Sequence, residues 1–390
     1  MAITGDTTTR TRTTPATQTR REPVTQPAPP PSRSGVPLLR AALRLTLVAL
    51  LGMAVLHWLG VAVQILGDPN GGFDFISYYA AALALRDNPA ANIYTLHTLQ
   101  VAALAHSAPY PGTRYMYPPL LAVLLLPLTW LRPDTALRLW DIFNLALWLA
   151  CLALLVRLLR ALLGVARPTN EHQPIPTGAR LFLVAVVAFL ALTYDPVAAG
   201  IGLGQINVLI CFLALLALDF ERRGRPGLAG AALAVASLLK VYPALLLGYY
   251  LLRGRWDVLR GAAVTFALLV AGMLPVLGIQ GLLESRNFLA AGDSAVVLAH
   301  NEALLRAPLW LATLAGGQPG TLASVSGALL VGLVGLAFAT GIVRVGRVPS
   351  TARTGGWRGW LPRYSRQPTA RNEVADITGY LWALCTMVLV

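Results

Sequence analysis

The chain has 390 residues, of which 56% are hydrophobic and only 12% are charged, and its mean hydropathy is +0.62. This composition excludes a soluble globular domain and is typical of a polytopic membrane protein, so we expect an all-α bundle of transmembrane helices. The formal net charge is +14, but the arginines gather in a few loops and an N-terminal arm, a pattern that indicates membrane topology and lipid headgroup contact rather than nucleic-acid binding.

The domain organisation begins with an N-terminal arm. Residues 1–37 are rich in Thr, Arg and Pro. They cannot bury enough apolar surface to fold, so we predict a disordered arm that its arginines hold in the cytoplasm. A transmembrane domain is expected over 38–390. Its first span, 38–66, is long enough to cross a bilayer with some tilt. Because the basic end of this span stays inside, 67–117 forms the first outer loop.

The first outer loop contains two short helix patterns, at 77–86 and 96–106, which we expect to lie along the membrane surface. The next apolar run, 118–131, is too short to span, so we predict a half-inserted element there. The loop 157–180 carries four arginines and is therefore expected inside. Only one crossing can lead there from the outer loop, and 137–159 supplies it.

Two further spans are expected at 181–198 and 203–218. A short apolar hairpin follows, formed by 228–239 and 243–252. Its break falls at Lys240-Val241-Tyr242-Pro243, because proline cannot continue a helix without the loss of a backbone hydrogen bond. The lysine at this break is the only one in the sequence.

The last third of the chain is expected to cross twice more, at 261–277 and 322–343, on either side of a second outer loop, 280–308. The segment 344–378 that follows is rich in arginine, and we assign it to the cytoplasm. The chain stops inside an apolar run, 380–390, which we expect to be a truncated copy of something longer.

This topology rests on arginine positions alone, yet it gathers four polar features on the outer side. They are Asp74, the turn Gly204-Gln205-Ile206-Asn207, Lys240 and the loop 280–308. Because these features played no part in the assignment, their convergence favours one extracytoplasmic site on a multi-pass protein of the plasma membrane.

Four short motifs occur in a fixed order: Asp74-Phe75, Tyr117-Pro118-Pro119, Gly204-Gln205-Ile206-Asn207 and Lys240-Val241-Tyr242-Pro243. With these motifs the chain, over about 40–345, resembles the DUF2029 (GT87-type) family. That family contains polyprenyl-phosphate-mannose-dependent α-mannosyltransferases of actinobacterial cell envelopes and related arabinofuranosyltransferases. The resemblance implies a fold of the GT-C type, a helical membrane core with large extracytoplasmic loops. It also implies a catalytic role for Asp74, since the family has an essential aspartate in its first outer loop.

The reaction that the resemblance implies is an inverting sugar transfer, which needs one base to take the proton of the acceptor hydroxyl. A lipid phosphate is already a stabilised leaving group, so the second need is for cations or hydrogen-bond donors that face it. Asp74 fits the base, and its neighbours Phe73 and Phe75 are expected to raise its pKa by desolvation. The alternative is structural: Asp74 caps a helix whose first turn begins near Ser77.

Lys240 is the candidate for the donor phosphate, because an unpaired lysine in an apolar hairpin costs about 3 kcal/mol to insert. Its alternative is snorkelling to the membrane interface. Gln205 and Asn207 are candidates for hydrogen bonds to sugar hydroxyls, or else they belong to a helix start within the bundle. Arg114 and Arg306 are candidates to assist at the phosphate, with headgroup anchoring as the alternative.

The remaining candidates also have two interpretations each. Tyr78 and Tyr117 stack on a sugar, or they belong to an interfacial aromatic belt. Asp195 is a second acid at an outer helix end, or a turn residue before Pro196. His300 serves an acceptor site or packs a loop. Neither the histidines nor the three cysteines show metal-ligand spacing, so no metal or other cofactor is expected.

We therefore expect an enzyme, a membrane hexosyltransferase that moves a sugar from a polyprenyl-phosphate donor to a glycolipid or glycan acceptor outside the cytoplasm. The expected sugar is mannose. One alternative uses polyprenyl-phospho-arabinose instead. Another is a transporter or flippase for lipid-linked sugars, which the sequence disfavours because it has one broken hairpin and no matching second half. A third is an inactive remnant.

Overall fold

The structure is a computed structural model that describes residues 35–68, 71–165 and 195–287, together with a few single residues such as Tyr380. Every regular element within these ranges is a helix, so the predicted all-α fold is confirmed. In chain order the elements are α1 (Gly35–Gly67), α2 (Phe73–Asp87), α3 (Leu96–Ala105), α4 (Leu120–Leu125), η1 (Leu126–Trp130), α5 (Pro133–Val165), α7 (Asp195–Gly202), α8 (Asn207–Arg222), α9 (Pro226–Leu239), α10 (Ala244–Leu252) and α11 (Trp256–Glu284).

Three helices in the described part of the chain are long and apolar enough to cross a bilayer. They are Leu45–Gly67 within α1, Pro133–Arg160 within α5, and α11. Each corresponds to a span that the sequence predicts. The run expected to be half-inserted forms the short helices α4 and η1, which together are well below spanning length.

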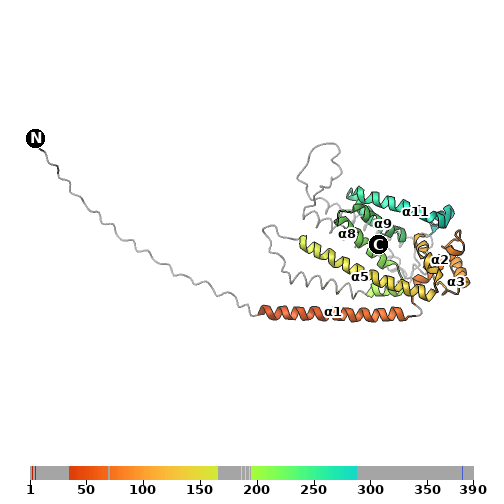
Figure 1. Ribbon diagram of the computed structural model, residues 1–390, viewed down its shortest axis with the longest axis horizontal. Coiled ribbons are helices and arrows are strands. Elements are labelled where there is room, and N and C mark those ends of the chain that lie inside the picture. The colour runs from red at the N-terminus through yellow and green to blue at the C-terminus, as the bar shows by residue number, and fades with distance from the viewer. Residues whose placement is uncertain are drawn as a thin grey trace, which may run out of the picture. The chain divides into compact units, whose positions relative to one another are not determined.

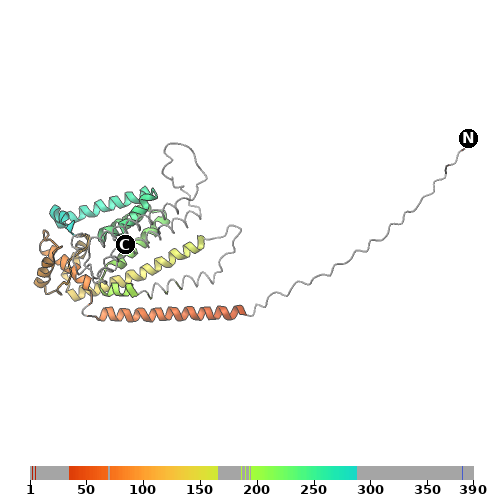
Figure 2. The same cartoon turned by 180° about the vertical axis from the view of Figure 1, so that it is seen from behind.

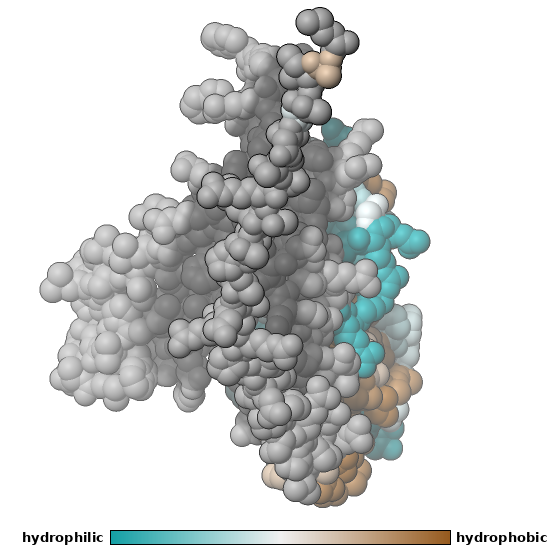
Figure 3. Space-filling model, turned by 90° about the vertical axis from the view of Figure 1, so that its left-hand side faces the viewer, coloured by the Kyte–Doolittle hydropathy of each residue, from teal (hydrophilic) through white to brown (hydrophobic). Residues whose placement is uncertain are grey.

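The long helices leave large apolar side chains on the surface. Val55 and Leu59 in α1, and Val264 and Leu268 in α11, are each at least 60% exposed. Figure 3 shows hydrophobic patches of this kind beside hydrophilic ones on one face of the molecule. Exposed apolar surface on this scale suits a lipid environment rather than water, so the molecule is a membrane protein.

The core of the bundle is built on α9, which packs between α8 and α11, while α8 also packs against α5 (Figure 1 and Figure 2). Small residues allow the close approach of α9 and α11. A Cβ atom on Gly230 would lie 1.9 Å from the Val258 carbonyl oxygen, and one on Gly261 would lie 2.2 Å from the Gly227 oxygen. Glycines at such contacts are typical of helices that pack in membranes.

The predicted broken hairpin is confirmed. Helix α9 ends at Leu239, Lys240 adopts an extended conformation with φ −153° and ψ 137°, and α10 begins after Pro243. The outer loop 280–308 is described only as far as Asn287, and most of 181–198 and all of 322–343 lie outside the described residues, as does all but the start of the 380–390 run.

Helix α2 differs from its prediction in two respects. It begins at Phe73 and not near Ser77, so Asp74 lies in its first turn, after the N-cap residue Gly72. It is also buried on all sides, since every residue from Ser77 to Leu85 is buried. Helices α3, α4 and η1 pack against it, a burial that the sequence did not predict. Its expected position along the membrane surface stays a prediction.

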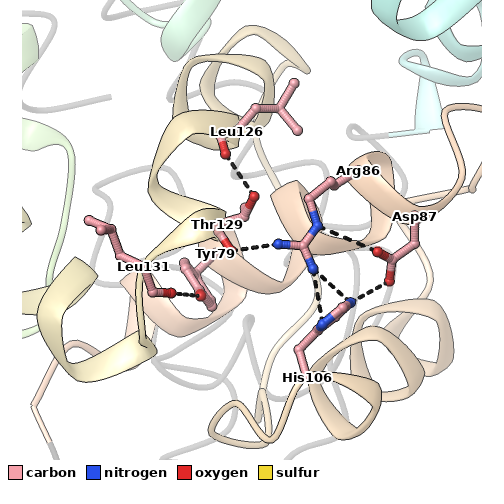
Figure 4. A network of polar contacts seen from close by, with 7 residues as sticks. All are labelled: Tyr79, Arg86, Asp87, His106, Leu126, Thr129 and Leu131. Atoms are coloured by element: carbon pink, nitrogen blue, oxygen red, sulfur yellow. Dashed lines mark hydrogen bonds and ion pairs between the residues drawn. The ribbon is translucent and has the colours of Figure 1, made fainter.

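A polar cluster joins α2, α3 and η1 at the end of α2 that lies away from Asp74 (Figure 4). The Arg86 guanidinium donates to the Thr129 carbonyl and also contacts the His106 ring. His106 Nε2 lies 2.7 Å from an Asp87 carboxylate oxygen. The cluster ties the C-terminal end of α2 to α3 and η1.

Candidate active site

The first turn of α2 is tied to the turn between α7 and α8 by backbone hydrogen bonds. The Gly72 amide donates to the Gly202 carbonyl and the Asp74 amide donates to the Leu203 carbonyl, both at 2.9 Å. Two segments about 130 residues apart in the sequence are thereby held in register. This pairing brings Asp74 next to Gln205.

Gly204 makes the close pairing of these segments possible. Its φ is +73°, a left-handed conformation that disfavours other residues. A Cβ atom on Gly204 would lie only 2.7 Å from the Phe75 Cβ atom. The Trp140 indole N–H donates to the Gly204 carbonyl at 2.8 Å and packs against the Phe75 ring at 5.7 Å between centroids. The turn is thus held from α2 and from α5.

A row of hydrogen bonds leads from Lys240 to Asp74. The Lys240 ammonium donates to Asn207 Oδ1 at 2.8 Å. Asn207 Nδ2 donates to Gln205 Oε1 at 2.6 Å. The Gln205 side chain is in turn hydrogen-bonded to the Asp74 carboxylate. We call these four residues the amide chain. It joins a candidate base, two candidate sugar-binding amides and a candidate phosphate-binding cation.

Tyrosines surround the cationic end of the amide chain. Lys240 Nζ lies 5.6 Å from the centroid of the Tyr117 ring and 5.2 Å from that of Tyr242, distances at which a ring face attracts a cation. Tyr78 meets Tyr117 edge to face, with 4.9 Å between centroids. Lys240 therefore has neighbours on several sides and is not a snorkelling residue that extends to an interface.

Two of the tyrosines at the site, Tyr78 and Tyr115, are buried in the core and not exposed at a membrane interface. Tyr78 is 1% exposed and Tyr115 is fully buried. The Tyr115 hydroxyl donates to the Pro118 carbonyl at 2.7 Å and accepts from the Ala122 amide at 3.1 Å. Tyr115 thus anchors the Tyr117-Pro118-Pro119 turn from within the core, a role that its position in the sequence did not indicate.

The site shifts the pKa values of both of its charged groups, the Asp74 carboxyl and the Lys240 ammonium. Asp74 and Lys240 lie outside the three helices of spanning length. Burial raises the pKa of Asp74, while the Gln205 hydrogen bond and the Lys240 charge act in the opposite direction. Burial lowers the pKa of Lys240 to about 8, against the attraction of Asp74. Of the two expected desolvating neighbours, Phe75 is buried and Phe73 is about half exposed.

A largely apolar cavity of about 440 Å³ lies beside the first turn of α2. Its lining includes Val61 and Ile65 from α1, Phe73 from α2, Ala198 from α7, and Leu203 from the α7–α8 turn. Asp74 follows Phe73 directly in the chain, so the cavity adjoins the site without containing its carboxylate. A lipid chain or an acyl group is the kind of ligand that such a lining suits.

The structure does not join all the predicted site residues. Arg114 is exposed and takes no part in the amide chain. Asp195 is the first residue of α7, but its side chain lies outside the description, and His300 and Arg306 lie outside the described residues altogether. Among the described residues, no three His, Cys, Asp or Glu side chains gather closely enough to hold a metal ion.

Comparisons with known proteins identify the family of the chain. The model of glycosyltransferase family 87 matches residues 115–360, a range that contains Gln205, Asn207 and Lys240 and begins after Asp74. One similar protein is the polyprenol-phosphate-mannose-dependent alpha-(1-2)-phosphatidylinositol mannoside mannosyltransferase of Mycobacterium tuberculosis (strain ATCC 25618 / H37Rv). It is 32% identical over 155 residues, which cover 39% of this chain and 35% of that protein.

The chain thus matches about a third of the length of this relative. No solved structure matches it significantly. The family match, in contrast, covers more than half of the 390 residues and includes most of the residues of the amide chain. The chain therefore belongs to glycosyltransferase family 87.

Proposed function

We propose that this protein is a mannosyltransferase that moves a mannosyl residue from a polyprenyl-phosphate donor to a glycolipid or glycan acceptor outside the cytoplasm. The observation that carries the proposal is the amide chain, which places a partly buried carboxylate and a partly buried cation at one site. The printed name of the relative supports mannose and a polyprenol phosphate as the donor, and a lipid-linked mannoside as the acceptor.

The proposed reaction needs one base and one stabilised leaving group. Asp74 takes the proton from the acceptor hydroxyl while that oxygen attacks the anomeric carbon from the face opposite the phosphate. The bond from the anomeric carbon to the phosphate oxygen breaks, and polyprenyl phosphate leaves with the electron pair. Lys240 faces the additional negative charge on that phosphate. The sugar product has inverted configuration at the anomeric carbon.

The apolar cavity beside α2 supports a lipid-borne substrate. Its lining is mostly aliphatic side chains, glycines and Phe73, with Gln64 and Asp68 as the polar members, and it adjoins the turn that carries Asp74. A lipid chain held there would keep its headgroup near the carboxylate. Membership of a glycosyltransferase family does not favour the transporter interpretation, which had no support in the sequence beyond a broken hairpin.

The test is sugar transfer by purified protein in lipid nanodiscs. The substrates are polyprenyl-phospho-[14C]mannose and a glycolipid extract of an actinobacterial envelope. We expect the wild type to transfer mannose and Asp74→Asn to be at least about 100-fold slower, since a positioned base contributes on that order or more. Asp134→Asn is the matched control, because Asp134 also lies in the first turn of a helix but is exposed and outside the amide chain.

Two outcomes would change the proposal. Equal transfer by the wild type and a folded Asp74→Asn variant would remove Asp74 from the mechanism. Transfer from polyprenyl-phospho-arabinose, with none from the mannose donor, would replace the proposed donor by the arabinosyl alternative while the base is retained.

A further inference from the structure

The amide chain has a direction that its chemistry imposes. An ammonium group only donates hydrogen bonds, so Asn207 must turn its oxygen toward Lys240. Its Nδ2 group then faces Gln205, which must present Oε1 as the acceptor. The remaining end of Gln205 is its Nε2 group, which donates to the Asp74 carboxylate. The lysine therefore requires the same orientation of the two amides that the ionised carboxylate requires.

Without the lysine, only the Asp74 carboxylate would fix the orientation of Gln205, and it would do so only while it is ionised, because a protonated carboxyl group can also donate. A reversed Gln205 would turn its carbonyl oxygen toward the carboxylate, and two acceptors would then face each other. The donor–acceptor distances are 2.6 Å from Asn207 Nδ2 to Gln205 Oε1 and 2.8 Å from Lys240 Nζ to Asn207 Oδ1, so these three side chains are in direct hydrogen-bonding contact. Donor groups that face a carboxylate favour its ionised form, and acceptors disfavour it.

We propose that Lys240 and Asn207 are positioning residues. They act through Gln205 to keep one of its N–H groups hydrogen-bonded to the Asp74 carboxylate, which holds this carboxylate ionised and in a fixed orientation. The inference rests on the proposed role of Asp74 as the base and deepens it. It gives Gln205 and Asn207 a role within the protein, in place of the direct contact with sugar hydroxyls that the sequence suggested.

The competing explanation is a through-space attraction between Lys240 and Asp74 that needs no chain. The other ionisable groups that face this carboxylate or the lysine within the described region are Tyr78, Tyr117 and Tyr242. Burial raises the pKa of all three tyrosines, so they stay neutral in the pH range where a carboxylate titrates. The two explanations can therefore be separated by removal of the link while the charge remains.

Asn207→Leu removes the link and leaves the charge. In the proposal, this variant and Lys240→Met each raise the pKa of Asp74 by about one unit or more, because either change frees Gln205 to reverse. Under through-space attraction alone, Lys240→Met has this effect and Asn207→Leu does not. Lys240→Arg should restore most of the wild-type value, since a guanidinium also donates to Asn207.

The direct measurement is a pH titration of the Asp74 carboxyl band by infrared spectroscopy in nanodiscs, with Asp74→Asn subtracted to isolate that band. Ser237→Ala is the control, because Ser237 lies on α9 one turn before Lys240 and donates only to the Leu233 carbonyl among the described contacts. Thermal melts check folding. If Asn207→Leu does not fold, Asn207→Ser replaces it, because a serine side chain is too short to reach both Lys240 and Gln205.

The second measurement is the pH profile of kcat/KM for mannose transfer. At a pH on the acid side of the profile, Asn207→Leu should be about tenfold less active than the wild type, with the difference closing as the pH rises. Lys240→Met should also stay slower at higher pH, because it lacks the cation that is proposed to face the donor phosphate. An unchanged infrared pKa in folded Asn207→Leu overturns the inference even if transfer is normal. A shifted pKa without any transfer by the wild type would support the inference and reject the proposed function.

Discussion

At the scale of single residues, Asp74 and Lys240 predict the pH dependence of the reaction. The base must be ionised, so the rate rises as the pH passes the pKa of Asp74, which burial raises above 3.8. The cation must be charged to face the phosphate, so the rate falls as the pH passes the Lys240 pKa of about 8. We expect a bell-shaped profile of kcat/KM with slopes of about tenfold per pH unit on each side.

Lys240→Arg is the test of the alkaline side of this profile. A guanidinium stays protonated throughout the accessible pH range, so the fall near pH 8 should disappear while the acid side remains. An alkaline side that is unchanged in Lys240→Arg would show that another group causes it. The measurement is initial rates from about pH 4 to pH 10, with protein stability checked by a melt at each end.

The sequence predicted which residues meet at the site better than it predicted how they meet. Arginine positions predicted that Asp74, Gln205 and Lys240 lie on one side of a membrane. The amide chain depends on the close approach of α2, the α7–α8 turn and the end of α9, which no local pattern encodes. The bond from Trp140 to Gly204 joins residues 64 positions apart, and nothing near Trp140 in the sequence signals it.

At the scale of elements, the start of α2 depends on a glycine in the opposing turn. Gly204→Ala would add a Cβ atom 2.7 Å from the Phe75 Cβ atom and would also strain a φ of +73°. Gly224→Ala is the matched control, since Gly224 has a φ of +71° but open space around the position of a Cβ atom. Both variants carry the conformational strain of about 1 kcal/mol, and only Gly204→Ala carries the clash.

The expected result is a lower melting temperature for Gly204→Ala than for Gly224→Ala, together with a large loss of transfer in Gly204→Ala alone. The loss follows because the two backbone hydrogen bonds that hold the first turn of α2 would have to lengthen. Equal melting temperatures and equal activities in the two variants would show that this close contact does not position Asp74.

The difference between α2 and its prediction has a physical cause at the same scale. The stretch from Ser77 to Leu85 is made of tyrosine, alanine and leucine with little charge, a composition that suits a surface of the membrane or a protein core equally well. Local sequence does not reveal that α3, α4 and η1 enclose it. The start at Phe73 follows from the pairing with the α7–α8 turn, which local sequence also does not encode.

At the scale of the whole molecule, the site and the Arg157–Asp219 ion pair lie at opposite ends of α5 and α8. In α5, Trp140 contacts the site and Arg157 pairs with Asp219 of α8. These two α5 residues are 17 positions apart, which is about 25 Å along a helix. In α8, Asn207 belongs to the amide chain, and Asp219 lies three turns later. The separation of about 25 Å between Trp140 and Arg157 along α5 is close to the thickness of a hydrocarbon core.

The separation predicts that cysteines introduced near the two ends of these helices react with a maleimide from opposite sides of the membrane. In a variant without the three native cysteines, Arg114→Cys, an exposed position before the Tyr117 turn, should react with a membrane-impermeant maleimide on intact cells. Arg225→Cys, an exposed position in the α8–α9 turn, should react only after permeabilisation, because arginine-rich turns stay in the cytoplasm. The reverse pattern would place Asp74 and Lys240 on the cytoplasmic side, where an extracytoplasmic acceptor could not reach them.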